Sequence, residues 1–162
     1  MLKDEIDILL VEDDPDDLEL TMRALQDEHI CNRIEIARDG EEALDFLFCR
    51  GSFSQRDPDC HPKLILLDLK LPKVDGLEVL EQIKRDPRTR ALPVVILTSS
   101  KQEDDLVRGY LLGGNSYIQK PVDFDQFRNT IKRLGYYWLL VNQPPPETAF
   151  EGGTQDELRS RV

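Results

Sequence analysis

The sequence contains few of the residues from which disulfide frameworks and zinc sites are built. Its 162 residues include three cysteines and two histidines. The cysteines are widely spaced and form no C-x-x-C pair, and neither His29 near Cys31 nor His61 beside Cys60 shows the paired spacing of zinc ligands. We therefore expect neither disulfides nor zinc, and free thiols in a reducing cytoplasm are the simpler interpretation.

Long apolar runs and an excess of basic residues are also missing. No run approaches the roughly 18–20 apolar residues that cross a bilayer, and residues 1–5 lack the start of a secretory signal. The chain has 21 Lys and Arg against 32 acidic residues, a formal net charge of −11. Because phosphate backbones attract basic surfaces, this acidity argues against nucleic-acid binding. We therefore expect a cytoplasmic protein with no membrane or nucleic-acid partner.

The acidity is concentrated at one end of the chain. Residues 1–28 carry eleven acidic and two basic side chains, a net charge of −9, whereas the other 134 residues have a net charge of −2. The acids surround one short apolar run, residues 6–11. A charge excess beside a candidate buried strand needs a structural or functional reason.

Five short segments are predicted as β-strands. Residues 6–11, 64–67 and 94–97 are apolar runs rich in branched residues, without the alternation of a half-buried strand. Residues 33–37 and 116–119 are more polar, which is typical of edge strands. We therefore expect a parallel sheet whose three central strands are buried on both faces.

Amphipathic segments alternate with these strands and predict five helices. They cover residues 15–28, 41–49, 76–85, 103–112 and 123–141. Pro15 after acidic residues favours a helix start, and Gly113-Gly114 favours a stop. Strand and helix repeated five times, with right-handed crossovers, predict an α/β flavodoxin-like fold, a doubly wound (βα)5 sheet in strand order 2-1-3-4-5.

Two segments stand apart from this repeat. Residues 50–62 form a long polar loop before the third strand. Residues 142–162 contain three consecutive prolines and a Gly-Gly pair, which predict a semi-rigid exit and then a disordered tail. The length suits one domain, which we place at residues 1–141.

Residues able to bind a cation and an anion follow the strands where they end. Glu12 and Asp13 follow the first strand, and Asp68 follows the third. Thr98 and Lys120 follow the fourth and fifth. The carboxyl ends of parallel strands meet at one edge of a sheet, so these side chains should share a crevice. Packed carboxylates require a cation such as Mg²⁺, and a hydroxyl and an ammonium beside it suit phosphoryl transfer to a carboxylate.

Each of these residues has a simpler interpretation when it is taken alone. Asp13 or Asp14 can cap the first helix. Asp68 can belong to a turn, and Lys120 can be solvated. The agreement of four independent strand ends favours a common site over these separate roles.

Four motifs around these residues resemble the receiver domain of two-component response regulators. They read I-L-L-V-E-D-D-P-D-D (8–17), L-I-L-L-D-L-K-L-P-K-V-D-G-L-E-V-L (64–80), L-P-V-V-I-L-T-S-S (92–100) and G-G-N-S-Y-I-Q-K-P-V (113–122). The resemblance extends from about residue 6 to residue 141. The 50–62 loop and Tyr136-Tyr137-Trp138 before the prolines are similar to the small stand-alone regulators that partner bacterial phytochrome histidine kinases.

The resemblance implies how phosphorylation would occur. Asp68 would accept a phosphoryl group from the phosphohistidine of a sensor histidine kinase. Mg²⁺ (or Mn²⁺) would be bound by Asp13, by Asp68 and by the backbone carbonyl of Lys70. Glu12 would bind the ion through a water.

Three further positions would bind the phosphoryl group and transmit its presence. Thr98 would hydrogen-bond a phosphoryl oxygen, and Lys120 would pair with the phosphoryl charge. Tyr117 matches the switch aromatic of the family, which turns inward when the threonine moves. The Lys120–Pro121 bond matches a peptide that is usually cis in the family.

No output module follows residue 141 in the sequence, so we expect signalling through altered protein contacts. Exposed apolar surface marks an interface, and symmetric dimers are the commonest oligomers. We expect a homodimer through the face formed by segments 103–112, 116–119 and 123–141. The candidate residues of this dimer face are Tyr110, Phe124, Tyr137 and Trp138. The alternative is that these side chains fold back on the core of the monomer.

Three other functions fit the sequence less well than a signalling phosphoacceptor. Phosphatases of the haloacid dehalogenase class have a second Asp two residues after the nucleophile, where this chain has Lys70. A flavodoxin-type nucleotide binder needs a phosphate-binding loop after the first strand, and 12–14 are all acidic here. A phosphorylation-independent docking scaffold stays open, although the complete set of site residues argues against it. We therefore do not expect an enzyme.

Overall fold

Parallel strands form a five-stranded sheet with the order β2-β1-β3-β4-β5, in agreement with the prediction. The computed structural model describes residues 6–26, 33–99, 103–120 and 123–150. The strands are β1 (Ile8–Val11), β2 (Ile34–Ala37), β3 (Leu64–Leu67), β4 (Val94–Thr98) and β5 (Ser116–Gln119). The flavodoxin-like, doubly wound α/β topology is therefore confirmed.

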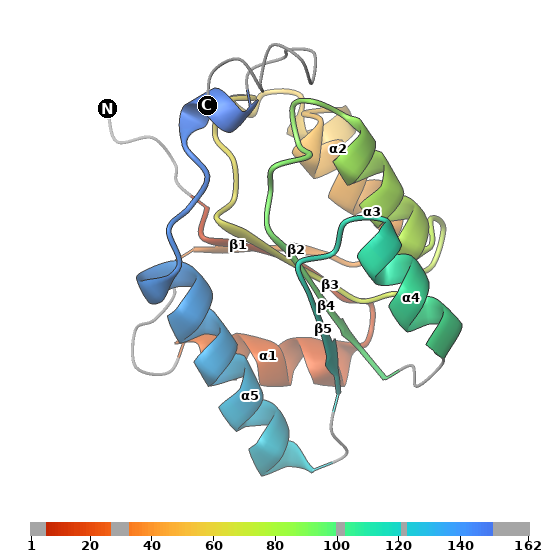
Figure 1. Cartoon of the computed structure of the whole chain (residues 1–162), viewed down its shortest axis with the longest axis vertical. Helices are drawn as coiled ribbons and strands as arrows, with labels where there is room; N and C mark the ends of the chain where they lie inside the picture. The colour runs from red at the N-terminus through yellow and green to blue at the C-terminus, as the bar shows by residue number, and fades with distance from the viewer. Residues whose placement is uncertain (1–5, 27–32, 100–102, 121–122, 151–162) are drawn as a thin grey trace.

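Helices connect the strands and cover both faces of the sheet. They are α1 (Pro15–Gln26), α2 (Gly40–Leu47), α3 (Gly76–Arg85), α4 (Glu103–Leu111) and α5 (Phe124–Tyr136). Figure 1 shows α1 and α5 on one face and α2, α3 and α4 on the other. Each helix runs back from the carboxyl edge to the amino edge of the sheet, so the loops after the strands gather at the carboxyl edge.

The central strands are buried on both faces, as their unbroken apolar runs predicted. Side chains alternate across the sheet. Leu9 and Val11 pack in the cluster that includes α2 and α3, whereas Ile8 and Leu10 pack in the cluster that includes α1 and α5. Because the core holds β1, β3 and β4 rigidly in register, the residues at their ends have fixed positions.

The last helix is not one regular helix up to residue 141, as the sequence predicted. Regular α5 ends at Tyr136, and η3 (Tyr137–Val141) continues as a π-helical segment. Within it, Trp138 and Leu139 are half-buried against the cluster of α1 and α5. Leu140 and Val141 are exposed.

The loop before β3 is tied to the core by one arginine. It contains the short helix η2 (Gly51–Phe53). The Arg56 guanidinium lies 3.8 Å from the centre of the Phe46 ring and donates hydrogen bonds to the backbone carbonyls of Phe46 and Cys60. The long polar loop predicted at 50–62 is therefore ordered and held against the core.

The start of the predicted tail is folded. Residues 142–150 are described and include the short helix η4 (Glu147–Phe150). The Phe150 ring stacks on His61, with 4.1 Å between ring centres, and packs against the cluster of α2 and α3. The remainder of the predicted tail, 151–162, lies outside the described residues.

Candidate functional site

The residues predicted from the strand ends converge at the carboxyl edge of the sheet. Carboxylate oxygens of Glu12, Asp13 and Asp68 all lie within 4.8 Å of one another. Glu12 and Asp68 are buried and Asp13 is exposed. The cluster therefore combines two carboxylates withdrawn from water with one that faces it.

Asp14, and not Asp13, caps the first helix. Its Oδ1 accepts hydrogen bonds from the backbone N–H groups of Asp16 and Asp17, at 2.9 and 3.1 Å. The backbone N–H of Asp14 in turn donates to Glu12 Oε1 at 3.2 Å. The alternative in which Asp13 served as the cap is thereby resolved, and the Asp13 carboxylate is left to the cluster.

The loop after β3 holds Asp68 in a defined orientation. The backbone N–H of Lys70 donates to Asp68 Oδ1 at 3.0 Å, which leaves Oδ2 directed at Lys120. The loop folds closely over the start of α3, and a Cβ at Gly76 would lie 2.3 Å from the Asp68 carbonyl oxygen. Glycine is therefore required at position 76 to let the loop carrying Asp68 close.

Lys120 lies at the centre of the acidic residues. Its Nζ donates to Glu12 at 2.6 Å, to Asp17 at 2.8 Å and to Asp68 at 2.9 Å, and 8% of its side chain is exposed. Burial alone would lower the pKa of Lys120, but the hydrogen bonds to Asp17 and Glu12 and the charge of Asp68 outweigh it and raise that pKa above its usual range. The ammonium is therefore permanently charged at neutral pH.

Glu12 is the carboxylate most affected by its surroundings. Burial raises the pKa of Glu12 to about 7, the hydrogen bond from Lys120 opposes that shift, and the charge of Asp68 adds to it. A buried carboxyl group whose charge is this costly is stabilised by a bound cation. The donor set is made of carboxylate oxygens, which are the ligands that Mg²⁺ and Mn²⁺ prefer, so the residues present fit a divalent ion.

Asp17 was missed by the reasoning from strand ends. It belongs to the first turn of α1, where acidic residues are common because they favour the helix N-terminus. The signal that was available is the position of that helix start directly after Glu12 and Asp13, which brings its first turn to the same edge of the sheet.

Comparison with known proteins agrees with this geometry. A family profile described as the response regulator receiver domain matches residues 8–132. The chain belongs to this family. Within the receiver domain the matched residues include β1 to β5 and every site residue named above.

Similar proteins include a probable regulatory protein and solved structures of response regulators. The chain is 46% identical to the probable methanogenesis regulatory protein FilR2 of Methanothrix harundinacea, over 88% of this chain and 90% of that one. The Mn²⁺-bound response regulator Rcp1 superposes with a TM-score of 0.80 at 38% identity, over 86% of this chain and 98% of that one. The bacteriophytochrome response regulator AtBRR gives a TM-score of 0.68 at 53% identity, over 86% and 99%.

The other residues predicted for the site, Thr98, Tyr117 and Lys70, differ in how far they are exposed. Thr98 is fully buried at the end of β4, and its carbonyl accepts a hydrogen bond from the Lys120 backbone at 2.8 Å. Tyr117 is half-buried, with its ring against α4, where a Cβ at Gly109 would lie 3.5 Å from it. The Lys70 side chain is exposed and pairs with Asp105 at 3.9 Å. The Lys120–Pro121 peptide lies outside the described residues.

The candidate dimer-face residues differ in their exposure. Tyr110 and Tyr137 are exposed. Trp138 is half-buried against the core of its own chain, which agrees with the alternative that this side chain folds back on the monomer. The Phe124 side chain lies outside the described residues.

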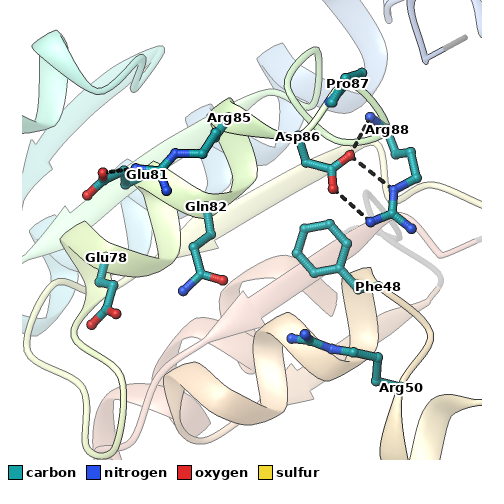
Figure 2. Close-up of a pocket in the computed structure, with 9 residues that line it drawn as sticks. All are labelled: Phe48, Arg50, Glu78, Glu81, Gln82, Arg85, Asp86, Pro87 and Arg88. Atoms are coloured by element: carbon teal, nitrogen blue, oxygen red, sulfur yellow. Dashed lines mark hydrogen bonds and ion pairs between the residues drawn. The ribbon is translucent and has the colours of Figure 1, made fainter. Parts of the chain in front are cut away.

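A separate hollow lies between the end of α2 and helix α3, away from the carboxylate cluster. Its volume is about 680 Å³, and Figure 2 shows its walls, in which the Asp86–Arg88 and Glu81–Arg85 pairs are already formed. Phe48 lies between Arg50 and Arg88, with 5.3 and 5.1 Å from the ring centre to each guanidinium carbon. Glu12, Asp68 and Lys120 do not line this hollow, so it is separate from the predicted phosphoryl site.

Membrane association through a spanning helix has no support in the described part of the chain. None of its helices is long and apolar enough to cross a bilayer.

Proposed function

We propose that this receiver domain accepts a phosphoryl group on Asp68 from a sensor histidine kinase, in a reaction that depends on Mg²⁺ or Mn²⁺, and then signals through altered protein contacts. The observation that carries the proposal is the position of Asp68. Its carboxylate is buried, is oriented by the Lys70 backbone and Lys120, and shares a cluster with Glu12 and Asp13. It acts as a phosphoacceptor and not as an enzyme of an independent substrate.

The chemistry follows from the arrangement of these groups. An oxygen of Asp68 attacks phosphorus, a P–O bond forms as the P–N bond to the donor histidine breaks, and that electron pair returns to the imidazole nitrogen. When bound, the cation neutralises charge on the phosphoryl oxygens. Asp13, Asp68, the Lys70 carbonyl and, through water, Glu12 would hold it.

Two residues bind the phosphoryl oxygens, and a third reports their occupancy. The Lys120 ammonium, now on Asp68 Oδ2, moves its hydrogen bond to a phosphoryl oxygen. The Thr98 hydroxyl donates a second bond. Tyr117, whose ring lies against α4, follows Thr98 inward and changes the surface of α4 and β5.

The test is labelling with acetyl phosphate and Mg²⁺. Wild type takes up label, and Asp68→Asn does not, because an amide is a poor nucleophile. Asp75→Asn is a matched control: Asp75 is exposed in the same loop, and its side chain makes no capping hydrogen bond. Uptake equal in wild type and Asp68→Asn would contradict the acceptor assignment. No uptake by wild type would favour the phosphorylation-independent docking scaffold.

The proposed donor is a phytochrome-type histidine kinase in the cytoplasm. Support comes from the homology to Rcp1 and to AtBRR, the latter named as a bacteriophytochrome response regulator. We propose that the kinase binds directly to the receiver domain. Because the chain is acidic, we expect no nucleic-acid partner.

The proposed oligomer is a homodimer of two copies of this chain. Its support is exposed apolar surface on α4 and on the end of the last helix: Leu106, Val107, Tyr110, Leu111, Tyr136, Tyr137, Leu140 and Val141. Leu111 and Leu140, at 80% and 62% exposure, are the points to change, since Trp138 supports the monomer core. In sedimentation at micromolar concentration, Leu140→Glu should be monomeric and the α1 surface control Arg23→Glu dimeric. A monomeric wild type would contradict the proposal.

A further inference from the structure

The Lys120 ammonium has three N–H donors, and three carboxylates accept them. Two of these, Glu12 and Asp68, belong to the cluster proposed to hold the cation and the phosphoryl group. Asp17, the third, has no such role, although its Oδ2 lies 2.8 Å from Nζ. We propose that Asp17 is a positioning residue that anchors Lys120 while Glu12 and Asp68 turn their charge to the cation. This inference rests on the proposed function.

Asp17 is held in place by α1 and not by the site. Its backbone N–H donates to the Asp14 carboxylate at 3.1 Å, and its carbonyl accepts the Thr21 hydroxyl at 2.8 Å. The neighbouring Leu18 is buried in the core beneath α1. Asp17 therefore offers an anchor whose position does not depend on a bound cation.

The solvent exposure of the three acceptors separates their roles. The side chains of Glu12 and Asp68 are 4% and 8% exposed, whereas that of Asp17 is 34% exposed. A carboxylate in contact with water bears less desolvation cost than the two buried ones. Asp17 also lies outside the carboxylate cluster, so it can keep its bond to Lys120 in both the metal-free and the metal-bound protein.

The balance of charge around Lys120 explains why such an anchor matters. Glu12, Asp13, Asp17 and Asp68 carry four formal negative charges against one positive charge on Lys120. A divalent cation draws the three carboxylates of the cluster to itself and weakens their hold on the lysine. A buried ammonium without an anionic partner is costly, and Asp17 offsets this cost. Without Asp17, the ammonium would face the cation's ligands alone and would compete with the cation for them.

The first test is the Mg²⁺ dissociation constant of the unphosphorylated protein, measured by calorimetry. Asp17→Asn should bind Mg²⁺ about tenfold more weakly than wild type, through lost charge and stronger competition from Lys120. Asp16→Asn is the matched control, since Asp16 lies in the same turn and carries the same charge but is exposed. Its effect should stay below about twofold. Equal effects of the two substitutions would overturn the inference.

The second test asks whether Asp17 acts through Lys120. In a Lys120→Met background, Asp17→Asn should weaken Mg²⁺ binding by only about threefold, because the competition by the ammonium is gone. Lys120→Gln serves if circular dichroism shows that Lys120→Met is unfolded. An effect of Asp17→Asn that is unchanged by removal of the lysine indicates a structural role and overturns the inference. Asp17→Glu, which keeps the carboxylate, should restore most of the affinity.

The outcomes separate this inference from the proposed function. A wild type that binds no Mg²⁺ and takes up no label contradicts both. A wild type that binds Mg²⁺ and is labelled on Asp68, with no special effect at Asp17, contradicts the inference alone.

Discussion

Two lysines withdrawn from water differ in their partners and therefore in what they do. Lys120, at the carboxyl edge of the sheet, donates to three carboxylates, and its pKa is raised. Lys84, near the amino edge at the end of α3, donates to the carbonyls of Arg90 and Leu92, at 3.1 and 2.7 Å. Among the described residues it has no ion-pair partner, and burial lowers its pKa to about 8. The comparison shows that burial of a lysine does not itself indicate a functional site. Acidic side chains that surround a buried lysine are the better indication of such a site.

The largest expected effect comes from removing the lysine at the carboxyl edge. Lys120→Met leaves Glu12 and Asp68 buried without a counter-charge, so unfolding free energy in the absence of Mg²⁺ should fall by about 2 kcal/mol. Added Mg²⁺ should recover most of that loss, because it binds the folded state. Urea denaturation with and without Mg²⁺ measures both. A loss that Mg²⁺ does not change would contradict the assignment of this cluster to a cation.

A smaller change in unfolding free energy is expected from substituting Lys84 at the amino edge of the sheet. Lys84→Met removes two hydrogen bonds to carbonyls but also a desolvated charge, so the unfolding free energy should change by about 1 kcal/mol or less. The same urea experiment should show no dependence of this change on Mg²⁺. If Mg²⁺ altered the stability of Lys84→Met as it does that of Lys120→Met, the two lysines would not be distinct in role.

The third effect is a pH dependence that belongs to Lys84 alone. Its folded-state pKa, about 8, lies below the ordinary value of 10.5, so between these values the unfolded chain binds a proton that the folded chain does not. Stability contributed by this group therefore rises with pH from 8 to 10.5 and is lost as pH falls through 8. The difference in unfolding free energy between wild type and Lys84→Met should rise over that window. A flat difference would mean that the two carbonyls fully stabilise the charged form.

The same comparison shows which parts of the protein the sequence could reveal. The sheet order and the convergence of Asp68 with Glu12 and Asp13 were predictable, because unbroken apolar runs mark buried parallel strands and such strands end at one edge. The ion pair between Lys120 and Asp17 of α1 was not predictable. Asp17 is one of several acids in that turn, and sequence spacing alone does not say which side chain reaches across from a helix to a strand end.

Two features of the C-terminal part could not be predicted from the sequence. The apolar spacing continues through residue 141, but regular α5 ends at Tyr136 and the backbone widens into a π-helical segment, a change that spacing alone does not signal. Three prolines suggested that the chain leaves the domain at residue 144. A single aromatic side chain six residues later, Phe150, instead finds His61 and holds 147–150 in place. Neither event has a periodic signal.

The stacking of Phe150 on His61 has a practical consequence for reporter design. It brings η4 to the end of the sheet opposite the tips of β4 and β5, as Figure 1 shows. A fluorophore at the exposed Thr148 would therefore sense release of this segment without adding charge or bulk beside Asp68. One probe there and one on α4 would distinguish events at the two ends of the molecule within a single phosphorylated sample.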